Sequence, residues 1–489
     1  MKKIKLLPVV ILFACFTLKA NAQKDILKYI KVYFTQPVDN TLSKGVNAVY
    51  LNNVIFDTLA QYINRAKYTI DIAQYEYETW TGDLVYTAIN NAYTRGVKIR
   101  IIQDNGYASK NTGFAKCNSK IPIIASPAPG AAPCSGTYNI MHNKFVIIDE
   151  QSPDTTKAIV WTGSPDWDQA MSQGDYNNVI IFQSKVLARA FTNEFDIMWG
   201  DTTHGGASNS SNSKFGPCKP NSGTHIFTIG GSKVELYFSP SDGVNNEIIS
   251  TIKTANIDLY CGMFTFTETT NATDIVNQKK AGATGYAILD NYSSGSYTPY
   301  TTILPGGLGS DFQGYVSSTY LYHNKYLIVN PSAACDDPKV LTGSHNWTSS
   351  ADAENDENTV IVHNDTIANE YLQAFGGDFK AIAGTSVVPP KNPCVTTGIN
   401  SVSSNEAVVN IYPNPYKDGV NISYDLGEDT KVTICVYNIM GQKIATLADG
   451  EMQSAGSHIF QFHAQVAGVY TLQIQQGQQI TVKKLIQVQ

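Results

Sequence analysis

The sequence predicts an α/β protein made of two repeated units, each a mixed sheet flanked by helices, followed by a C-terminal β-sandwich. Three observations predict this fold: a duplicated motif, the same succession of strand and helix patterns around each copy, and short alternating strands near the C-terminus. A chain of 489 residues is too long for one ordinary domain, and a content of 43% hydrophobic and 16% charged residues is typical of a folded soluble protein.

The duplicated motif is a His-Asn-Lys triplet that is followed by one aromatic and three aliphatic residues. Each copy is followed by a Gly-Ser segment and then by an Asn-rich segment, and the offset from Gly163 to Asn178 equals that from Gly343 to Asn358. Two blocks that align without a gap indicate two equivalent structural units. The matched segments are MHNKFVIIDE (141–150) and YHNKYLIVNP (322–331), WTGSPDW (161–167) and LTGSHNW (341–347), and GDYNNVII (174–181) and ENDENTVI (354–361).

The aliphatic run in each copy is typical of a buried strand, which fixes where the polar residues point. Side chains two apart on a strand share a face, so His142 and Lys144 point together, as do His323 and Lys325. Pairing the two units about a pseudo-twofold axis would bring two imidazoles and two ammonium groups together.

Asp149 and Asn330 follow the two strands and have the opposite parity. We therefore interpret Asp149 as a turn or strand-end anchor rather than a catalytic group. Asn330 could make similar neutral hydrogen bonds, so it is expected to damage the site less than a missing catalytic carboxylate would.

Two lysines and two histidines in one place form a phosphate site. The lysines hold the non-bridging oxygens, one His attacks phosphorus, and the other protonates the leaving oxygen. This scheme requires neither a metal nor a cofactor. Further donors to the phosphate oxygens are expected from the Gly-Ser segments, namely Ser164, Asp166, Ser344 and Asn346.

The pattern HxKxxxxD followed by GSxN resembles the HKD motif of the phospholipase D superfamily, over roughly residues 30–382. The resemblance implies a phosphohistidine intermediate on His142, with His323 as the acid and then the base. It also implies a carboxylate that orients a catalytic His, a position that Glu357 matches.

Three residues depart from the family pattern. Asn330 replaces the Asp of the second motif, Asp166 replaces the Asn of the first GSxN, and Asn177 replaces the first Glu. An imidazole without its carboxylate is a weaker base, so the identity of the nucleophile stays open between the two histidines. A degenerate surface protein without activity also remains an alternative.

The first unit is expected to run strand, helix, strand, helix, strand before its motif, the second unit to follow the same α/β layout, and both to close with an amphipathic helix. A helix between the second and third strands is predicted for the first unit only. The expected strands are 32–36, 68–77 and 97–104 in the first unit, and 234–240, 256–266 and 284–290 in the second; the helices are 54–66, 82–96, 186–200, 246–255 and 366–380.

Residues 1–22 are expected to be a secretory signal peptide, with a basic start, an apolar core and the small-residue site Ala20-Asn21-Ala22. Its removal takes four lysines and no acidic residue, which changes the formal charge from −6 to about −10. The predicted order is then a first unit (23–200), a loop or linker (201–226), a second unit (227–382), a stiff linker (383–405) and a C-terminal domain (406–489).

The C-terminal domain is predicted to be a small antiparallel β-sandwich, because short alternating strands recur at close spacing. Its IYPNP, VYNIMGQKI, AGVYTLQI and KKLIQV segments resemble the C-terminal sorting domain of the bacterial type IX secretion pathway. The resemblance implies an export address read by the type IX machinery, and a secreted or cell-surface location. A carbohydrate- or surface-binding module is the alternative.

Seven cysteines remain after the predicted signal peptide, and export permits disulfides. Cys117 and Cys134 are the expected pair, because they would close the Pro/Gly-rich loop before the first motif. Cys261 is expected to be a buried, free strand residue.

The function that these patterns favour is an exported, metal-independent phosphodiesterase of the phospholipase D type. It would hydrolyse a glycerophospholipid at a membrane surface, as a monomer whose two units pair within the chain. The same residues could act on DNA or RNA, and transfer of phosphatidyl groups to an alcohol is a further alternative. The acidic net charge favours lipid, since non-specific nucleic-acid binding usually needs a basic groove.

Overall fold

The computed structural model describes residues 26–488, apart from 131–136, 392, 395–408, 427–428, 439–441, 465 and 478. The predicted signal peptide lies outside the described residues. The chain divides into two compact units, Met1–Val395 and Thr396–Gln489.

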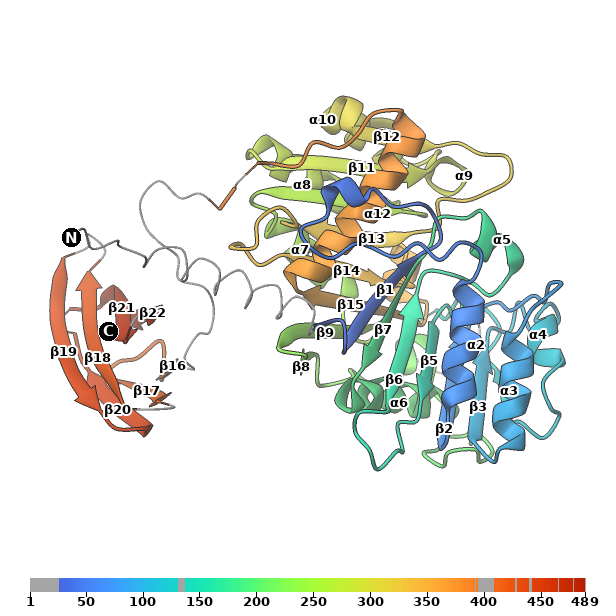
Figure 1. Ribbon diagram of the computed structural model, residues 1–489, viewed down its shortest axis with the longest axis horizontal. Coiled ribbons are helices and arrows are strands. Elements are labelled where there is room, and N and C mark those ends of the chain that lie inside the picture. The colour runs from blue at the N-terminus through green and yellow to red at the C-terminus, as the bar shows by residue number, and fades with distance from the viewer. Residues whose placement is uncertain are drawn as a thin grey trace, which may run out of the picture. The chain divides into compact units, whose positions relative to one another are not determined.

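The first compact unit contains two mixed sheets that share one strand order (Figure 1). The first sheet has the order β1-β7-β6-β5-β2-β3-β4, and the second has the equivalent order β9-β15-β14-β13-β10-β11-β12, with β8 added at its edge. The predicted α/β repeat is therefore confirmed. The strands are β1 (Ile30–Phe34), β2 (Thr69–Gln74), β3 (Lys98–Gln103), β4 (Ile123–Ala125), β5 (Lys144–Ile148), β6 (Ile159–Gly163), β7 (Asn178–Gln183), β8 (Ile226–Ile229), β9 (Ser232–Ser239), β10 (Asp258–Met263), β11 (Thr284–Asp290), β12 (Phe312–Tyr315), β13 (Lys325–Val329), β14 (Lys339–Gly343) and β15 (Glu357–His363).

Helices connect these strands, and α2 and α3 lie side by side over the first sheet (Figure 1). In α2 the buried residues recur at helical spacing (Ile55, Phe56, Leu59, Ala60 and Ile63), which explains the match to the predicted helix 54–66. The helices are α2 (Ile55–Arg65), α3 (Val85–Thr94), α4 (Thr112–Ala115), α5 (Gln169–Gln173), α6 (Lys185–Trp199), α7 (Val244–Lys253), α8 (Thr269–Lys280), α9 (Asn291–Ser294), α10 (Leu304–Leu308), α11 (Ser349–Ala353) and α12 (Asp365–Ala383).

The two sheets are joined by side-chain hydrogen bonds and by a shared core. Asn178 Nδ2 donates to Asn324 Oδ1 at 2.9 Å, and Asn358 Nδ2 donates to Thr162 Oγ1 at 2.7 Å. These bonds link β6 and β7 of the first sheet to the second motif and to β15 of the second sheet. One hydrophobic cluster contains buried residues of both sheets, so the repeats form one folded body rather than two tethered ones.

The segment that precedes each motif is fixed against the other sheet. The backbone N–H of His142 donates to the carbonyl of Asp356 at 2.9 Å, and the N–H of Tyr176 donates to the carbonyl of Leu321 at 2.9 Å. The two motifs therefore meet where the sheets face each other.

Residues 201–226, where a loop or linker was expected, are largely irregular but firmly attached to the core. The buried ammonium of Lys219 contacts Asp356 at 2.7 Å and also pairs with Glu194. Asp356 in turn accepts a hydrogen bond from the backbone N–H of Gly216 at 2.7 Å. These contacts hold the segment beside the strand that carries Glu357.

The C-terminal unit consists of two antiparallel sheets around a separate core, which contains Ile422, Ile434 and Leu472. The predicted β-sandwich is confirmed by this arrangement. Its sheets are β16-β17-β20 and β19-β18-β21-β22, with the strands β16 (Val409–Tyr412), β17 (Val420–Leu426), β18 (Thr430–Asn438), β19 (Lys443–Gln453), β20 (Gly456–Phe462), β21 (Gly468–Gln476) and β22 (Gln479–Gln487). Among the described residues, no helix has the length and apolar character needed to cross a membrane.

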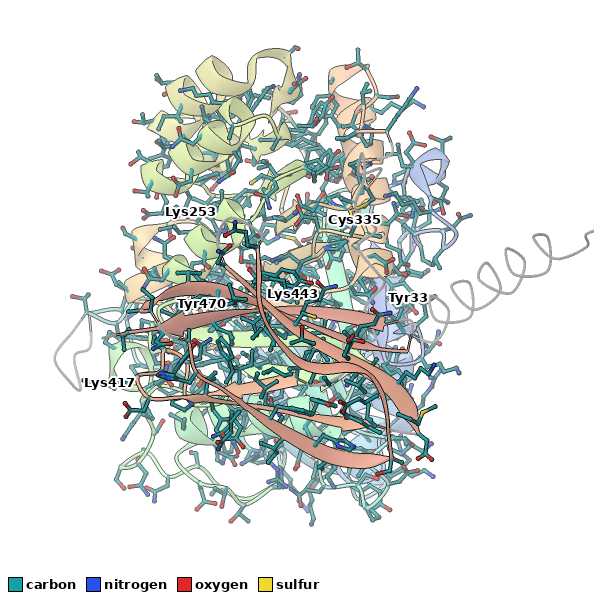
Figure 2. All side chains as sticks on the ribbon, turned by 90° about the vertical axis from the view of Figure 1, so that its left-hand side faces the viewer. Tyr33, Lys253, Cys335, Lys417, Lys443 and Tyr470 are labelled. Atoms are coloured by element: carbon teal, nitrogen blue, oxygen red, sulfur yellow. A yellow bond between two sulfur atoms is a disulfide. The ribbon has the colours of Figure 1, made fainter. Side chains whose placement is uncertain are left out.

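The expected disulfide between Cys117 and Cys134 is wrong, because Cys117 carries a free thiol. Cys117 packs into the core beneath the first sheet with Phe114 and Ile121, so its side chain points inward; Cys134 lies outside the described residues. Cys335 instead bonds to Cys394 (Figure 2). Cys218 also takes part in a disulfide. Cys261 is free and fully buried in β10, as predicted.

Candidate active site

The four motif residues lie at the starts of two equivalent strands, where the sheets meet. β5 begins at Lys144 and β13 at Lys325, with each histidine two residues before its lysine. Only 6% of His142 and 3% of His323 are exposed, and both lysines are buried. Polar groups at this depth are rarely kept unless they are paired or functional.

Each histidine is oriented by a side chain from the opposite sheet. His142 Nδ1 lies 2.8 Å from Glu357 Oε2, and the same oxygen accepts a hydrogen bond from Ser344 at 2.6 Å. With Nδ1 donating to this carboxylate, Nε2 of His142 carries the lone pair that a nucleophile needs.

His323 has the equivalent arrangement with an amide in place of the carboxylate. Its Nδ1 lies 3.1 Å from Asn177 Oδ1, which also accepts a hydrogen bond from Ser164 at 2.7 Å. The replacement of Glu by Asn177 therefore affects His323. Of the two equivalent positions, 177 and 357, only Glu357 supplies a carboxylate, and it orients His142. The asymmetry favours His142 as the nucleophile.

Burial and nearby lysines set the charges in the site. Burial, followed by the charge of Lys144, lowers the pKa of His142 well below its usual value; burial and Lys325 do the same for His323. Both imidazoles are thus held neutral near pH 7. Burial raises the pKa of Glu357 to about 7, and burial and Lys144 lower the pKa of Lys325 well below its usual value. A bound phosphate would relieve the repulsion between the two ammonium groups.

Aromatic rings form two matching walls of the site. The Lys144 ammonium lies 4.8 Å from the ring centre of Tyr75, and the Lys325 ammonium lies 4.9 Å from that of Phe264. The same rings meet His142 and His323 edge-on, at 4.8 and 4.6 Å between centroids. Sequence reasoning missed both rings, although their equivalent positions after β2 and β10 were visible in the repeat.

Asp166 lies between the two motifs. Its Oδ1 is 3.0 Å from Lys144 Nζ, and its Oδ2 is 4.0 Å from His323 Nε2. A carboxylate in this place contacts Lys144, the same cation that a phosphate oxygen would contact. Asp166, which replaces the Asn of the family pattern, thus puts a negative charge inside the site.

We expect Asp166→Asn to raise kcat/KM for a phosphodiester by roughly tenfold, because removing a charge that competes for Lys144 is worth on the order of 1 kcal/mol. Steady-state kinetics with a soluble diester at fixed ionic strength measure this. Asp168→Asn is the matched control, since Asp168 caps α5 and makes no ion pair with either motif lysine among the described residues. A fall in kcat/KM for Asp166→Asn would show instead that the carboxylate assists the reaction.

Asp149 and Asn330 lie at the far ends of their strands, in left-handed backbone conformations with φ of 56° and 53°. Asp149 Oδ1 accepts hydrogen bonds from the backbone N–H groups of Lys67 and Tyr68 at 2.9 and 2.7 Å. Asn330 Oδ1 accepts from Ile257 N at 3.0 Å, in the equivalent place. Both residues contact backbone and not the motif side chains.

Asn330 also donates through Nδ2, to the carbonyls of Thr254 and Asp336 at 3.0 and 2.9 Å. We therefore expect Asn330→Asp to leave kcat within about twofold but to lower the unfolding free energy by roughly 1–3 kcal/mol, because two part-buried carbonyls lose their donor. Urea denaturation and steady-state kinetics on the same sample measure the two effects. A large loss of kcat at unchanged stability would contradict the assignment as an anchor.

The remaining predicted residues are close to the site but have different neighbours. Asn346 Oδ1 accepts a hydrogen bond from the backbone N–H of Thr265 at 3.3 Å, next to Phe264, so its side chain supports that wall. Sequence reasoning missed His345, which is buried with neither ring nitrogen hydrogen-bonded to a described residue. Burial lowers the pKa of His345 to about 4. Within the described part of the chain, no group of three or more His, Cys, Asp or Glu residues could hold a metal ion.

Comparison with known proteins relates this site to a family. The family model for the cardiolipin synthase PLD-like domain matches residues 59–199 and 248–379, together more than half of the chain. The model for the secretion system C-terminal sorting domain matches residues 410–489.

Among curated proteins, a mitochondrial cardiolipin hydrolase of Drosophila melanogaster is 34% identical over 155 residues, which cover 29% of this chain and 57% of that protein. A phospholipase D of Rickettsia conorii is 26% identical over 150 residues, covering 30% of this chain and 70% of that protein. The chain thus spans less than two thirds of the Drosophila protein.

Among solved structures, a phosphatidylserine synthase of Haemophilus influenzae superposes with a TM-score of 0.51 at 11% identity, covering 74% of this chain and 90% of that chain. At this identity the likeness concerns the fold. The two family matches, together with the paired motifs, lead to one conclusion: the chain belongs to the phospholipase D superfamily and carries a C-terminal sorting domain of the type IX secretion pathway, which implies a secreted or cell-surface location.

Proposed function

We propose that this protein hydrolyses the head-group phosphodiester of a glycerophospholipid through a phosphohistidine on His142. The paired His/Lys site supports phosphodiester chemistry, as family membership does. The choice of lipid is supported by the segment that borders His323. Residues 291–322 contain six tyrosines and no lysine or arginine, and Tyr292 and Val316 are 82% and 73% exposed.

This segment follows β11 and includes β12, and the parts that directly follow these two parallel strands lie at the active-site end of the second sheet. It ends at Tyr322, whose backbone N–H donates to Asp290 at 2.8 Å. A rim of exposed Tyr and Val side chains suits the polar-apolar boundary of a membrane, whereas a nucleic-acid strand needs cations along its backbone.

In the first step, Nε2 of His142 attacks phosphorus, the bond from phosphorus to the head-group oxygen breaks, and His323 gives its proton to that oxygen. The substrate phosphate adds negative charge beside His323 and so favours its protonated form before attack. In the second step, His323 takes a proton from water, the water oxygen attacks phosphorus, and the phosphorus–nitrogen bond breaks. The products are phosphatidic acid and the free alcohol, and both histidines are regenerated.

The proposed function is tested with the purified chain, in EDTA, on phosphatidylcholine vesicles and on single-stranded DNA in parallel. We expect choline release without DNA cleavage, and no release by the His142→Asn variant. Cleavage of DNA without hydrolysis of the lipid would show instead that this site is that of a nuclease. Inactivity on both substrates in a folded sample would contradict the proposed lipid hydrolysis.

A further inference from the structure

A second cavity lies at the opposite end of the first sheet from the active site. β5 runs from Lys144 in the site to Ile148 in the wall of this cavity, which at about 3.3 Å per residue separates the two places by roughly 13 Å. The cavity encloses about 280 Å³ and is built by the ends of β5 and β7, the first residues of β1 and β6, and the last turn of α2.

The floor of the cavity is apolar and aromatic. Ile148, Ile159 and Ile181 come from three neighbouring strands, and Tyr62 of α2 stands beside them. The Tyr62 ring is held in place by an edge contact with Trp161, at 5.9 Å between centroids. Burial raises the pKa of Tyr62, so its hydroxyl stays protonated and can donate a hydrogen bond.

The rim of the cavity is strongly basic in a chain whose formal charge is −6. The cations are Lys28, Lys31, Arg65, Lys67 and Lys157, and the only acidic residue in the lining is Asp149. The carboxylate of Asp149 is engaged by the backbone N–H groups of Lys67 and Tyr68, as described above.

Three of these five cations have no carboxylate partner among the described residues. Lys31, Arg65 and Lys67 form no ion pair with any carboxylate of the described residues, and Arg65 instead lies 5.3 Å from the Tyr62 ring centre. Lys157 has an exposed pair with Asp154 at 3.7 Å, which is weak at such exposure. A rim with several unneutralised cations attracts an anion of more than one charge.

We propose that this cavity binds a phosphomonoester carried on an aromatic or aliphatic body. The Arg65 guanidinium suits phosphate oxygens, which it can hold through two parallel hydrogen bonds, and the lysines neutralise the second charge. The isoleucine floor and the tyrosine rings take the attached body. At about 280 Å³ the cavity holds one phosphate with one ring or a short chain, and the rest of a larger ligand would extend out of its open side.

The site is distinct from the phosphodiesterase site, since none of the four motif histidines and lysines lines it; it meets the first motif only at Ile148 and Asp149, at the other end of β5. A phosphomonoester is nevertheless the kind of product that hydrolysis of any phosphodiester releases. The same ligand chemistry is found in a nucleotide and in a short phosphatidate, and the experiment separates these sources.

Binding is measured by calorimetry on the full chain at low ionic strength, with AMP, dihexanoyl phosphatidate, inorganic phosphate and adenosine as probes. We expect AMP or the phosphatidate to bind at least about tenfold more tightly than inorganic phosphate, and adenosine to bind weakly. Tighter binding of AMP would identify an aromatic body, and tighter binding of the phosphatidate an aliphatic one. Equal binding of AMP and adenosine, or binding of inorganic phosphate alone, would overturn the proposal.

Charge reversal locates the binding. Arg65→Glu with Lys67→Glu should weaken binding of the better probe more than tenfold, while Lys120→Glu with Lys280→Glu, which makes the same change of charge at exposed sites elsewhere, should leave it unchanged. Tyr68→Ser, which removes an aromatic ring from the cavity lining, should weaken binding of the better probe but not of inorganic phosphate. Hydrolysis of a soluble diester should be equal in both double variants, so a failure here is distinct from a failure of the proposed lipid hydrolysis. Equal binding in the two double variants would place the ligand elsewhere and refute the site.

Discussion

His142→Asn is expected to lower kcat by at least about 10³-fold, because removal of a covalent nucleophile leaves only binding and electrostatic stabilisation. Asn is close to His in size and keeps a hydrogen-bonding group facing Glu357, so the buried site should stay folded. His323→Asn is expected to cause a similar loss, since it removes both the proton donor for the leaving oxygen and the base for water. Steady-state turnover of a soluble diester measures both losses.

The control for these variants is His458→Asn. His458 is partly exposed in the C-terminal unit, and among the described residues its ring hydrogen-bonds to the nearby carbonyl of Ser454 at 2.8 Å. It should retain full activity, and circular dichroism should show the same fold in all three variants. Activity close to the parent level in either motif variant would refute the assignment of that histidine.

Lys325→Met is expected to lower kcat/KM by roughly 10²–10³-fold while leaving the protein at least as stable as the parent. Lys325 is 1% exposed, and the one hydrogen bond that its ammonium makes to a described residue goes to the carbonyl of His323 at 2.9 Å. Burial and the charge of Lys144 lower the pKa of Lys325 well below its usual value, so these surroundings disfavour its charged form. Met fills a similar volume without that charge, so activity and stability should change in opposite directions.

Lys144→Met provides the comparison. Lys144 is already paired with Asp166 at 3.0 Å, so removing its charge leaves a buried carboxylate without its cation. We expect that variant to lose stability, in contrast to Lys325→Met. Thermal unfolding of both variants at pH 7 separates them, and a destabilised Lys325→Met with parent-like kcat/KM would contradict a phosphate-binding role for this lysine.

The local parts of this structure were predictable from sequence because they are encoded locally. The FVII and YLIV runs predicted β5 and β13, and side-chain parity predicted that Asp149 and Asn330 end their strands rather than face the motifs. The helix α8 was missed because its first turns hold Thr and Asn and only Ala272, Ile275 and Val276 give an apolar face.

The cross-sheet parts could not be predicted with the same ease. His142 and Glu357 are 215 residues apart, and only the folded pairing of the repeats shows that each histidine is oriented by the other unit. The sequence shows that Asn177 replaces the first Glu. It does not show that each histidine contacts the other unit, and so it did not reveal which imidazole keeps its carboxylate. The disulfide between Cys117 and Cys134 was wrongly predicted because closeness in sequence does not determine the direction in which a thiol points.

The central claim is that His142 forms the covalent bond to phosphorus, and trapping that bond tests it most directly. In His323→Asn, a diester with an acidic leaving alcohol can still phosphorylate His142, while hydrolysis of the intermediate lacks its base. Mass spectrometry of the digested, alkali-quenched protein should then find the phosphoryl adduct on the peptide that contains His142, and no adduct in His142→Asn. An adduct on His323 in the His142→Asn variant, with none on His142, would contradict the account.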